Sequence, residues 1–139
     1  MGEKLVRVGT TYLPVINVNE SAEWYVEKLG AVLSYKDEDK AIINLANQSF
    51  FLVKAVENGT ANFIDAYGEE RFSLTFEVDG EEALVHLREE LCQKEVKVGE
   101  LEDRGHIGRN FVFYDLNGNK FDVWSELSPF FKGQFSNKM

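Results

Sequence analysis

Apolar and polar side chains alternate along several short stretches of the chain, which is the pattern of strands that bury one face. The first stretch covers residues 5–16 and is rich in β-branched and aromatic side chains. Asn17 then offers a helix cap, and apolar residues recur at helical spacing until Gly30. The pattern predicts a strand over 5–16 and a helix over 18–29.

The same order of elements is predicted twice. Three strands follow the first helix, over 31–36, 41–45 and 49–55, and a polar connection covers 57–70. The second set is a strand over 71–78, a helix over 80–94, and strands over 96–101, 110–114 and 120–124. The Asn-Gly pair between the last two strands favours a tight turn. The pattern therefore predicts two βαβββ modules, with Thr10 in the first matching Ser73 in the second.

Successive strand side chains point to opposite faces, so the alternation also predicts what each face carries. Leu13 and Val15 are predicted to pack under the first helix. The equivalent apolar face of the second module consists of Phe72, Leu74, Phe76 and Val78. A curved mixed sheet with its helices on the outer face leaves a concave opposite face, where ligands commonly bind. The residues predicted to line it are Thr10, Tyr12, Phe51, Ser73, Thr75, Glu77, Phe113, Asp122 and Trp124.

Length and composition fit this organisation. The chain has 139 residues, of which 44% are hydrophobic, so we expect one domain over 1–139 with a core large enough to be stable without disulfides. Its modules are expected over about 5–56 and 71–126, followed by an aromatic tail over 127–139.

Charge and cysteine content exclude several roles. The net charge of −9 repels nucleic acid and anionic membrane surfaces, so neither is an expected partner. The single cysteine, Cys92, gives no intrachain disulfide, and the start of the chain lacks an apolar signal segment. We therefore expect a cytoplasmic protein.

The module order resembles a known superfamily. Leu13-Pro14-Val15 stands shortly before a capped helix that carries Trp24-Tyr25, and the second module ends in Tyr114-Asp-Leu-Asn-Gly-Asn-Lys-Phe-Asp122. These features resemble the vicinal oxygen chelate superfamily, which includes glyoxalase I, extradiol dioxygenases, and fosfomycin- and bleomycin-resistance proteins. The resemblance covers about residues 5–126 and implies an α+β fold of two tandem βαβββ modules, and a homodimer.

The resemblance also implies where a divalent metal would be held. Carried over by position, the ligand places are Thr10, Phe51, Ser73 and Asp122. Phe51 has no donor atom, and neutral hydroxyls are poor ligands for transition metals, so only Asp122 is suitable. We therefore expect no metal and no other cofactor.

The two histidines do not supply a metal site by their positions. His86 falls within the second helix, where an exposed surface position is expected. His106 lies in the loop Gly105-His106-Ile107-Gly108-Arg109, which is either a flap over the concave face or an ordinary polar loop.

The leading functional hypothesis is metal-free binding, in which the protein sequesters a small cationic or aromatic molecule. The carboxylates of Glu77 and Asp122 beside aromatic rings suit such a ligand. The alternative is a metal-dependent lyase, isomerase or dioxygenase with Ni, Zn, Mn or Fe. Its ligands would be displaced by a register shift of one or two residues, with Tyr12, Glu77 and Glu126 as the candidates.

A third hypothesis is an interaction module whose groove accepts a peptide or the chain's own tail. The tail segment 129–135 carries three aromatic residues and is too short to form an independent helix. It is expected to dock on its own domain, to cross to a partner subunit, or to remain loose.

Overall fold

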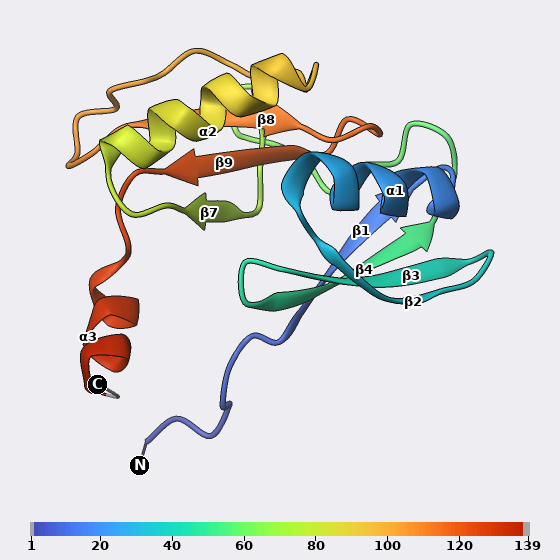
Figure 1. The fold of residues 1–139 in the computed structure, drawn as a ribbon, viewed down its shortest axis with the longest axis horizontal. Helices are drawn as coiled ribbons and strands as arrows, with labels where there is room; N and C mark the ends of the chain where they lie inside the picture. Colours follow the sequence, from blue (N-terminus) through green and yellow to red (C-terminus); the bar gives the residue numbers. More distant parts are fainter. Residues whose placement is uncertain (1, 138–139) are drawn as a thin grey trace. The chain divides into compact units, whose positions relative to one another are not determined.

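The computed structural model describes residues 2–137, and side chains as far as Gly133 in the last helix. The chain forms two compact units (Figure 1). The first unit runs up to Ala61 and includes Leu116–Gly118, and the second begins at Asn62. The expectation of one domain over 1–139 stays a prediction.

The first unit is a four-stranded sheet with one helix on it. Its elements are β1 (Thr10–Val15), α1 (Val18–Leu29), β2 (Val32–Lys36), β3 (Lys40–Leu45) and β4 (Gln48–Lys54). The strand order is β1-β4-β3-β2, with β1 parallel to β4 and the other pairs antiparallel. Pro14 therefore lies on an edge strand, where its missing N–H is tolerated.

The core of the first unit lies between α1 and this sheet (Figure 1). Leu13, Val15, Phe50 and Leu52 are buried there beneath Tyr25 of the helix. The predicted inward face of the first strand is thus confirmed. Burial of such apolar side chains contributes about 1.5–3 kcal/mol each.

Local signals fix both ends of α1. The Asn17 side chain accepts a hydrogen bond from the Glu20 amide at 2.9 Å, and Gly30 ends the helix at φ +73°. The helix covers the predicted residues 18–29. Within the same unit, the Asn117 Oδ1 atom accepts from the Ile16 amide at 3.0 Å, and its Nδ2 donates to the buried Ser21 hydroxyl at 2.9 Å.

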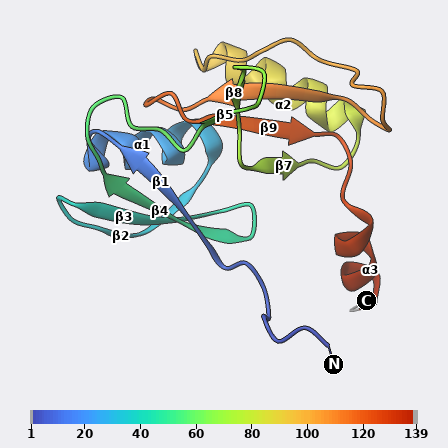
Figure 2. The same ribbon diagram turned by 180° about the vertical axis from the view of Figure 1, so that it is seen from behind.

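The second unit repeats the plan with a shorter sheet (Figure 2). Its elements are β5 (Phe63–Ile64), β6 (Glu70–Arg71), β7 (Thr75–Glu77), α2 (Glu81–Gln93), β8 (Asn110–Tyr114), β9 (Lys120–Trp124) and α3 (Pro129–Asn137). The sheet order is β7-β9-β8, with β7 parallel to β9. Its core contains Leu84 and Leu91 of α2 together with Phe111, Phe121 and Val123 of the sheet.

Three predicted strands differ from the structure. The strand expected over 5–16 is shorter, because β1 begins only at Thr10 and ends at Val15. The strand expected over 71–78 is divided, because Arg71 pairs with Phe63 in the β5–β6 hairpin and β7 begins only at Thr75. The strand expected over 96–101 is reduced to one isolated bridge, Val98 to Phe113, and a second bridge, Glu102 to Asn110, lies just beyond it. The pairing slips by one residue between these bridges, and such a bulge interrupts the ladder.

The tail forms the helix α3, where no helix was predicted. Phe130 is exposed, and Phe135 lies outside the residues whose side chains are described. No helix in the described part of the chain is long and apolar enough to cross a membrane.

Candidate functional site

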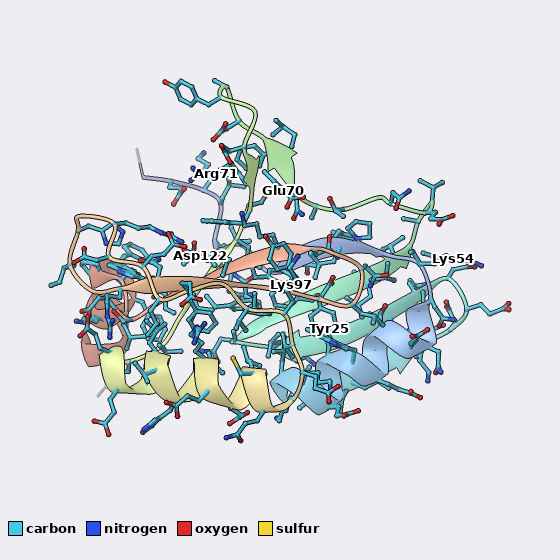
Figure 3. The ribbon with its side chains drawn as sticks, turned by 90° about the horizontal axis from the view of Figure 1, so that it is seen from above. Tyr25, Lys54, Glu70, Arg71, Lys97 and Asp122 are labelled. Carbon is cyan, nitrogen blue, oxygen red and sulfur yellow. The ribbon has the colours of Figure 1, made fainter. Side chains whose placement is uncertain are left out.

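Strands β7 and β9 bring four of the predicted site residues together on one face. Their parallel register places Thr75 beside Asp122 and Glu77 beside Trp124. Figure 3 shows Asp122 on the face of the sheet away from α2. The alternate residues, such as Val123, are buried in the core under α2. The candidate site is therefore the face that carries Asp122.

Asp122 is a buried carboxylate held by three different side chains. Only 2% of its surface is exposed. Its Oδ2 atom accepts hydrogen bonds from the Thr75 hydroxyl and from Asn110 Nδ2, both at 3.0 Å. Its Oδ1 atom lies 3.1 Å from Nη2 of Arg104. A buried charge costs several kcal/mol unless it is paired in this way.

Arg104 covers Asp122 from the side of a loop. Its side chain is 26% exposed, its Nε donates to Glu102 at 3.1 Å, and its guanidinium lies 5.7 Å from the ring of Phe72. Burial lowers the pKa of Arg104, but the hydrogen bond with Glu102 and the charge of Asp122 offset this, and the net pKa is raised. The cation beside Asp122 is therefore permanent.

Two buried acceptor atoms of the cluster lack a hydrogen bond within the described part of the chain. Among the described residues, neither Asn110 Oδ1 nor Asp122 Oδ1 receives a hydrogen bond, although both atoms are buried. Nη2 of Arg104 lies 3.1 Å from Asp122 Oδ1, so the charge of this oxygen is paired although its hydrogen-bonding capacity is not filled. An unsatisfied buried acceptor costs about 1–3 kcal/mol. The cluster is thus able to accept hydrogen bonds from a further donor.

The loop around His106 packs against the end of β9. Trp124 Nε1 donates to the Ile107 carbonyl at 2.9 Å, and the His106 ring meets the Trp124 ring edge-on at 5.8 Å. Gly108 sits at φ +76°, and a Cβ there would lie 2.4 Å from the Ser125 hydroxyl. The loop is therefore attached to a residue of the candidate site, and both sequence interpretations, a flap and an ordinary polar loop, stay predictions.

The cation that reaches Asp122 was missed by the sequence analysis. Arg109 is the loop cation named there, but its Nε lies 3.4 Å from Glu81 at the start of α2. Arg104 takes the place on Asp122 instead. The only local signals for this residue are the neighbouring glycines, which permit the loop to turn at φ +86° and +76°.

In the first unit, aromatic rings occupy the place that Asp122 has in the second. Tyr12 is paired with Phe51 in the parallel register of β1 and β4, and their ring centroids are 5.0 Å apart. Thr75 and Asp122 form the matching pair in β7 and β9. Tyr12 is 63% exposed, and Thr10 is exposed near the start of the same strand. This unit therefore presents a small exposed aromatic surface.

The surroundings of Ser73, Glu77 and Phe113 differ from those of Asp122. Ser73 is exposed in the segment before β7. The Glu77 carboxylate accepts a hydrogen bond from the Ser128 amide at 2.9 Å. Phe113 does not lie on the face with Asp122: it is 2% exposed and its ring is 5.3 Å from that of Phe121. The antiparallel register explains this, because Val112 is the residue opposite Asp122 and its neighbour points to the core.

The residues at the implied metal positions do not fit a transition metal. Phe51 offers no donor, and Thr10 and Ser73 offer only neutral hydroxyls. The open oxygen of Asp122 faces a guanidinium, which repels a divalent cation. Among the described residues, no three His, Cys, Asp or Glu side chains form a group that could hold a metal ion. His86 is exposed on α2.

A separate surface depression lies in the first unit. Its volume is about 390 Å³, and it is lined by residues around the start of α1 together with Lys36, Asp37 and Lys54. The Tyr35 hydroxyl and the Asp39 and Lys40 amides hold the pKa of Asp37 well below its ordinary value. None of the predicted site residues lines this depression.

Comparisons with known proteins identify the fold of this chain through solved structures. No family model matches the chain, and no curated protein matches it either. Among solved structures, lactoylglutathione lyase from Agrobacterium tumefaciens has a TM-score of 0.69 at 13% identity, covering 88% of this chain and 95% of its own. The fosfomycin resistance protein FosX from Listeria monocytogenes, complexed with Mn(II) and sulfate, has a TM-score of 0.71 at 14% identity, covering 95% and 99%.

A third structure, a glyoxalase/bleomycin resistance protein/dioxygenase from Alicyclobacillus acidocaldarius, has a TM-score of 0.66 at 15% identity and covers 88% of this chain and 93% of its own. All three matches span most of both chains. They confirm the predicted α+β fold of tandem βαβββ modules.

Proposed function

We propose a function for this chain from its fold, which is that of the vicinal oxygen chelate superfamily, and from the chemistry of the Asp122 face. The protein binds and sequesters a small cationic or aromatic molecule without a metal. The observation that carries this proposal is the occupation of the four implied metal positions. They hold a ring, two hydroxyls, and a carboxylate whose open oxygen faces Arg104.

The groups on this face suit recognition better than bond breaking. Asp122 and Asn110 provide buried acceptor oxygens, and the half-buried Trp124 ring lies on the same face. A cation over an aromatic ring gains about 0.5–2 kcal/mol, and a charge-assisted hydrogen bond to a carboxylate adds to this. Capture by such contacts leaves the ligand chemically unchanged.

A metal-binding experiment separates this proposal from a metal-dependent lyase, isomerase or dioxygenase. The purified protein is dialysed against a chelator and then melted with Ni²⁺, Zn²⁺, Mn²⁺ or Fe²⁺, in parallel with elemental analysis. A metal at one hundred times its Kd adds about 2.7 kcal/mol of stability, or about 9 °C in Tm for a chain of this length. We expect no such shift. Stoichiometric metal that Asp122→Asn releases would overturn the proposal.

A ligand-binding experiment tests the capture itself. Calorimetry with metal-free bleomycin, as a cationic probe, is expected to show saturable binding that Asp122→Asn or Trp124→Ala weakens at least tenfold. Two control variants remove a carboxylate and an aromatic ring from exposed positions: Glu89→Gln on α2 and Tyr67→Ala on the β5–β6 turn. Both should leave the affinity unchanged. Equal losses from all four variants, or chemical conversion of the probe, would refute passive capture.

Two further expectations belong to the same proposal. The homodimer implied by the resemblance is measured by sedimentation velocity on the full chain. If a peptide library shifts the melting temperature while cationic small molecules do not, the interaction-module hypothesis replaces capture.

A further inference from the structure

The segment from Asp103 to Arg109, here called the Arg104 loop, is anchored at both ends. At its start, the amides of Glu102 and Asn110 each donate to the other's carbonyl, at 2.7 and 3.0 Å. At its end, the Arg109 amide donates to the Ser125 hydroxyl at 2.9 Å. Two contacts hold its middle to the Asp122 face: the Arg104 ion pair and the hydrogen bond from Trp124 to the Ile107 carbonyl.

The ion pair that holds this loop leaves part of its hydrogen-bonding capacity unused. A guanidinium has five N–H donors, and a carboxylate prefers two parallel donors from it. Arg104 instead directs its Nε to Glu102, while its Nη2 lies 3.1 Å from Asp122 Oδ1. The Asp122 Oδ1 and Asn110 Oδ1 atoms remain without a hydrogen bond, although both residues are at least 97% buried.

The surroundings of Arg104 are those of a bound flat cation. Its guanidinium lies 5.7 Å from the Phe72 ring and 3.1 Å from the Asp122 carboxylate, so it is close to both an aromatic ring and a buried anion. A ligand with a planar amidinium or guanidinium group offers the same charge and shape. A free ligand also lacks the tether to Glu102 and can align with the vacant acceptors.

We propose that Arg104 is an internal substitute for the ligand's cation, and that the ligand displaces the Arg104 loop from Asp122. This inference rests on the proposed function and specifies its ligand class as planar amidinium or guanidinium compounds. The ion pair between Arg104 and Asp122 is then an autoinhibitory contact, because it occupies the carboxylate that the ligand would bind. The apparent Kd equals the intrinsic Kd divided by the fraction of molecules in which Asp122 is uncovered.

The test uses benzamidine, an amidinium on an aromatic ring, and calorimetry on the full chain. Arg104→Gln removes the competing charge and is expected to lower the Kd for benzamidine at least tenfold. Arg109→Gln is the matched control, because it removes an equal charge from the same loop at a residue that pairs with Glu81 instead. We expect no more than a twofold change from it. The double variant Arg104→Gln/Asp122→Asn should not show this increase in affinity for benzamidine.

A second measurement keeps the proposal testable if Arg104→Gln folds poorly. The indole N–H of Trp124 donates to the loop, so its nuclear magnetic resonance signal in a Trp24→Phe background reports the loop position in the otherwise native chain. Saturating benzamidine should shift this signal, and Asp122→Asn should abolish the shift. An unmoved signal at a concentration where calorimetry shows binding would overturn the displacement.

The outcomes also separate this inference from the proposed function. If bleomycin binds the natural chain but Arg104→Gln gives no gain with benzamidine, capture stands and loop displacement is wrong. If Arg104→Gln binds benzamidine tightly while the natural chain binds neither probe, the displacement site exists and the capture function is wrong.

Discussion

The ion pair between Arg104 and Asp122 should be measurable as a coupling energy in the stability of the protein. The perturbation is a double-mutant cycle of Arg104→Met, Asp122→Asn and the pair. Methionine keeps an apolar stem beside Phe72, and asparagine keeps the shape of the carboxylate. The cycle isolates the interaction between the two side chains from their separate contributions.

The structure sets the size of the effect. At the observed 3.1 Å, the Coulomb energy is about 5 kcal/mol for an effective dielectric constant of about 20 and about 1 kcal/mol in bulk water. Asp122 is buried, but a quarter of the Arg104 side chain is exposed to solvent, so the coupling lies between these limits. We expect about 2 kcal/mol, which corresponds to about 7 °C in Tm for a chain of this length.

Urea unfolding followed by circular dichroism, at low and high salt, measures the four free energies. Arg104→Met alone should destabilise the protein by about 2–3 kcal/mol, because it leaves a buried carboxylate without its counter-ion. The same substitution in the Asp122→Asn background should cost well under 1 kcal/mol. A coupling energy below about 0.5 kcal/mol, the value of an ordinary surface pair, would refute the view that this ion pair holds the loop.

Three other predictions concern the first unit. Gly30→Ala should cost about 1 kcal/mol in urea unfolding and Gly30→Asn less, because the residue is at φ +73° with open space around its Cβ position; equal costs would contradict this. Asp37→Asn should lower the Tm at pH 7. The folded pKa of Asp37 lies below its unfolded value of about 4, so its contribution to the free energy of unfolding is complete above pH 4 and is lost as the pH falls through the folded pKa. The difference in Tm between the natural chain and Asp37→Asn should therefore disappear in melts at acid pH. Asn117→Ala should cost about 2–3 kcal/mol, because it removes hydrogen bonds to Ile16 and to the buried Ser21; Leu116→Ala, at an exposed neighbour, is the control and should cost much less.

Elements with strong local signals were predicted well from the sequence. The cap at Asn17 and the glycine at position 30 fix α1 to the predicted residues. The strands β8 and β9 also match the prediction, because the Asn-Gly turn between them sets their pairing. Alternation assigned Leu13 and Asp122 to the correct faces for the same reason, since one face of each strand is apolar and the other is not.

The errors arise where tertiary contacts decide between local alternatives. Phe111, Val112 and Phe113 are all apolar, so alternation alone cannot choose the buried face, and pairing of Val112 with Asp122 decides it. The one-residue slip beside β8 has no sequence signal. Arg104 is 18 positions from Asp122 and belongs to no periodic pattern, so its role in the site emerges only from the fold.

The matching positions of the two halves have a consequence for how such a chain can change. The same parallel rung joins Tyr12 to Phe51 in one half and Thr75 to Asp122 in the other, so the backbone tolerates either two rings or a hydroxyl and a carboxylate at that point. The two halves thus offer the same backbone pairing with different side chains on it. Side chains at this pairing can be substituted in one half while the other half keeps its packing. A binding surface can therefore change without loss of the fold.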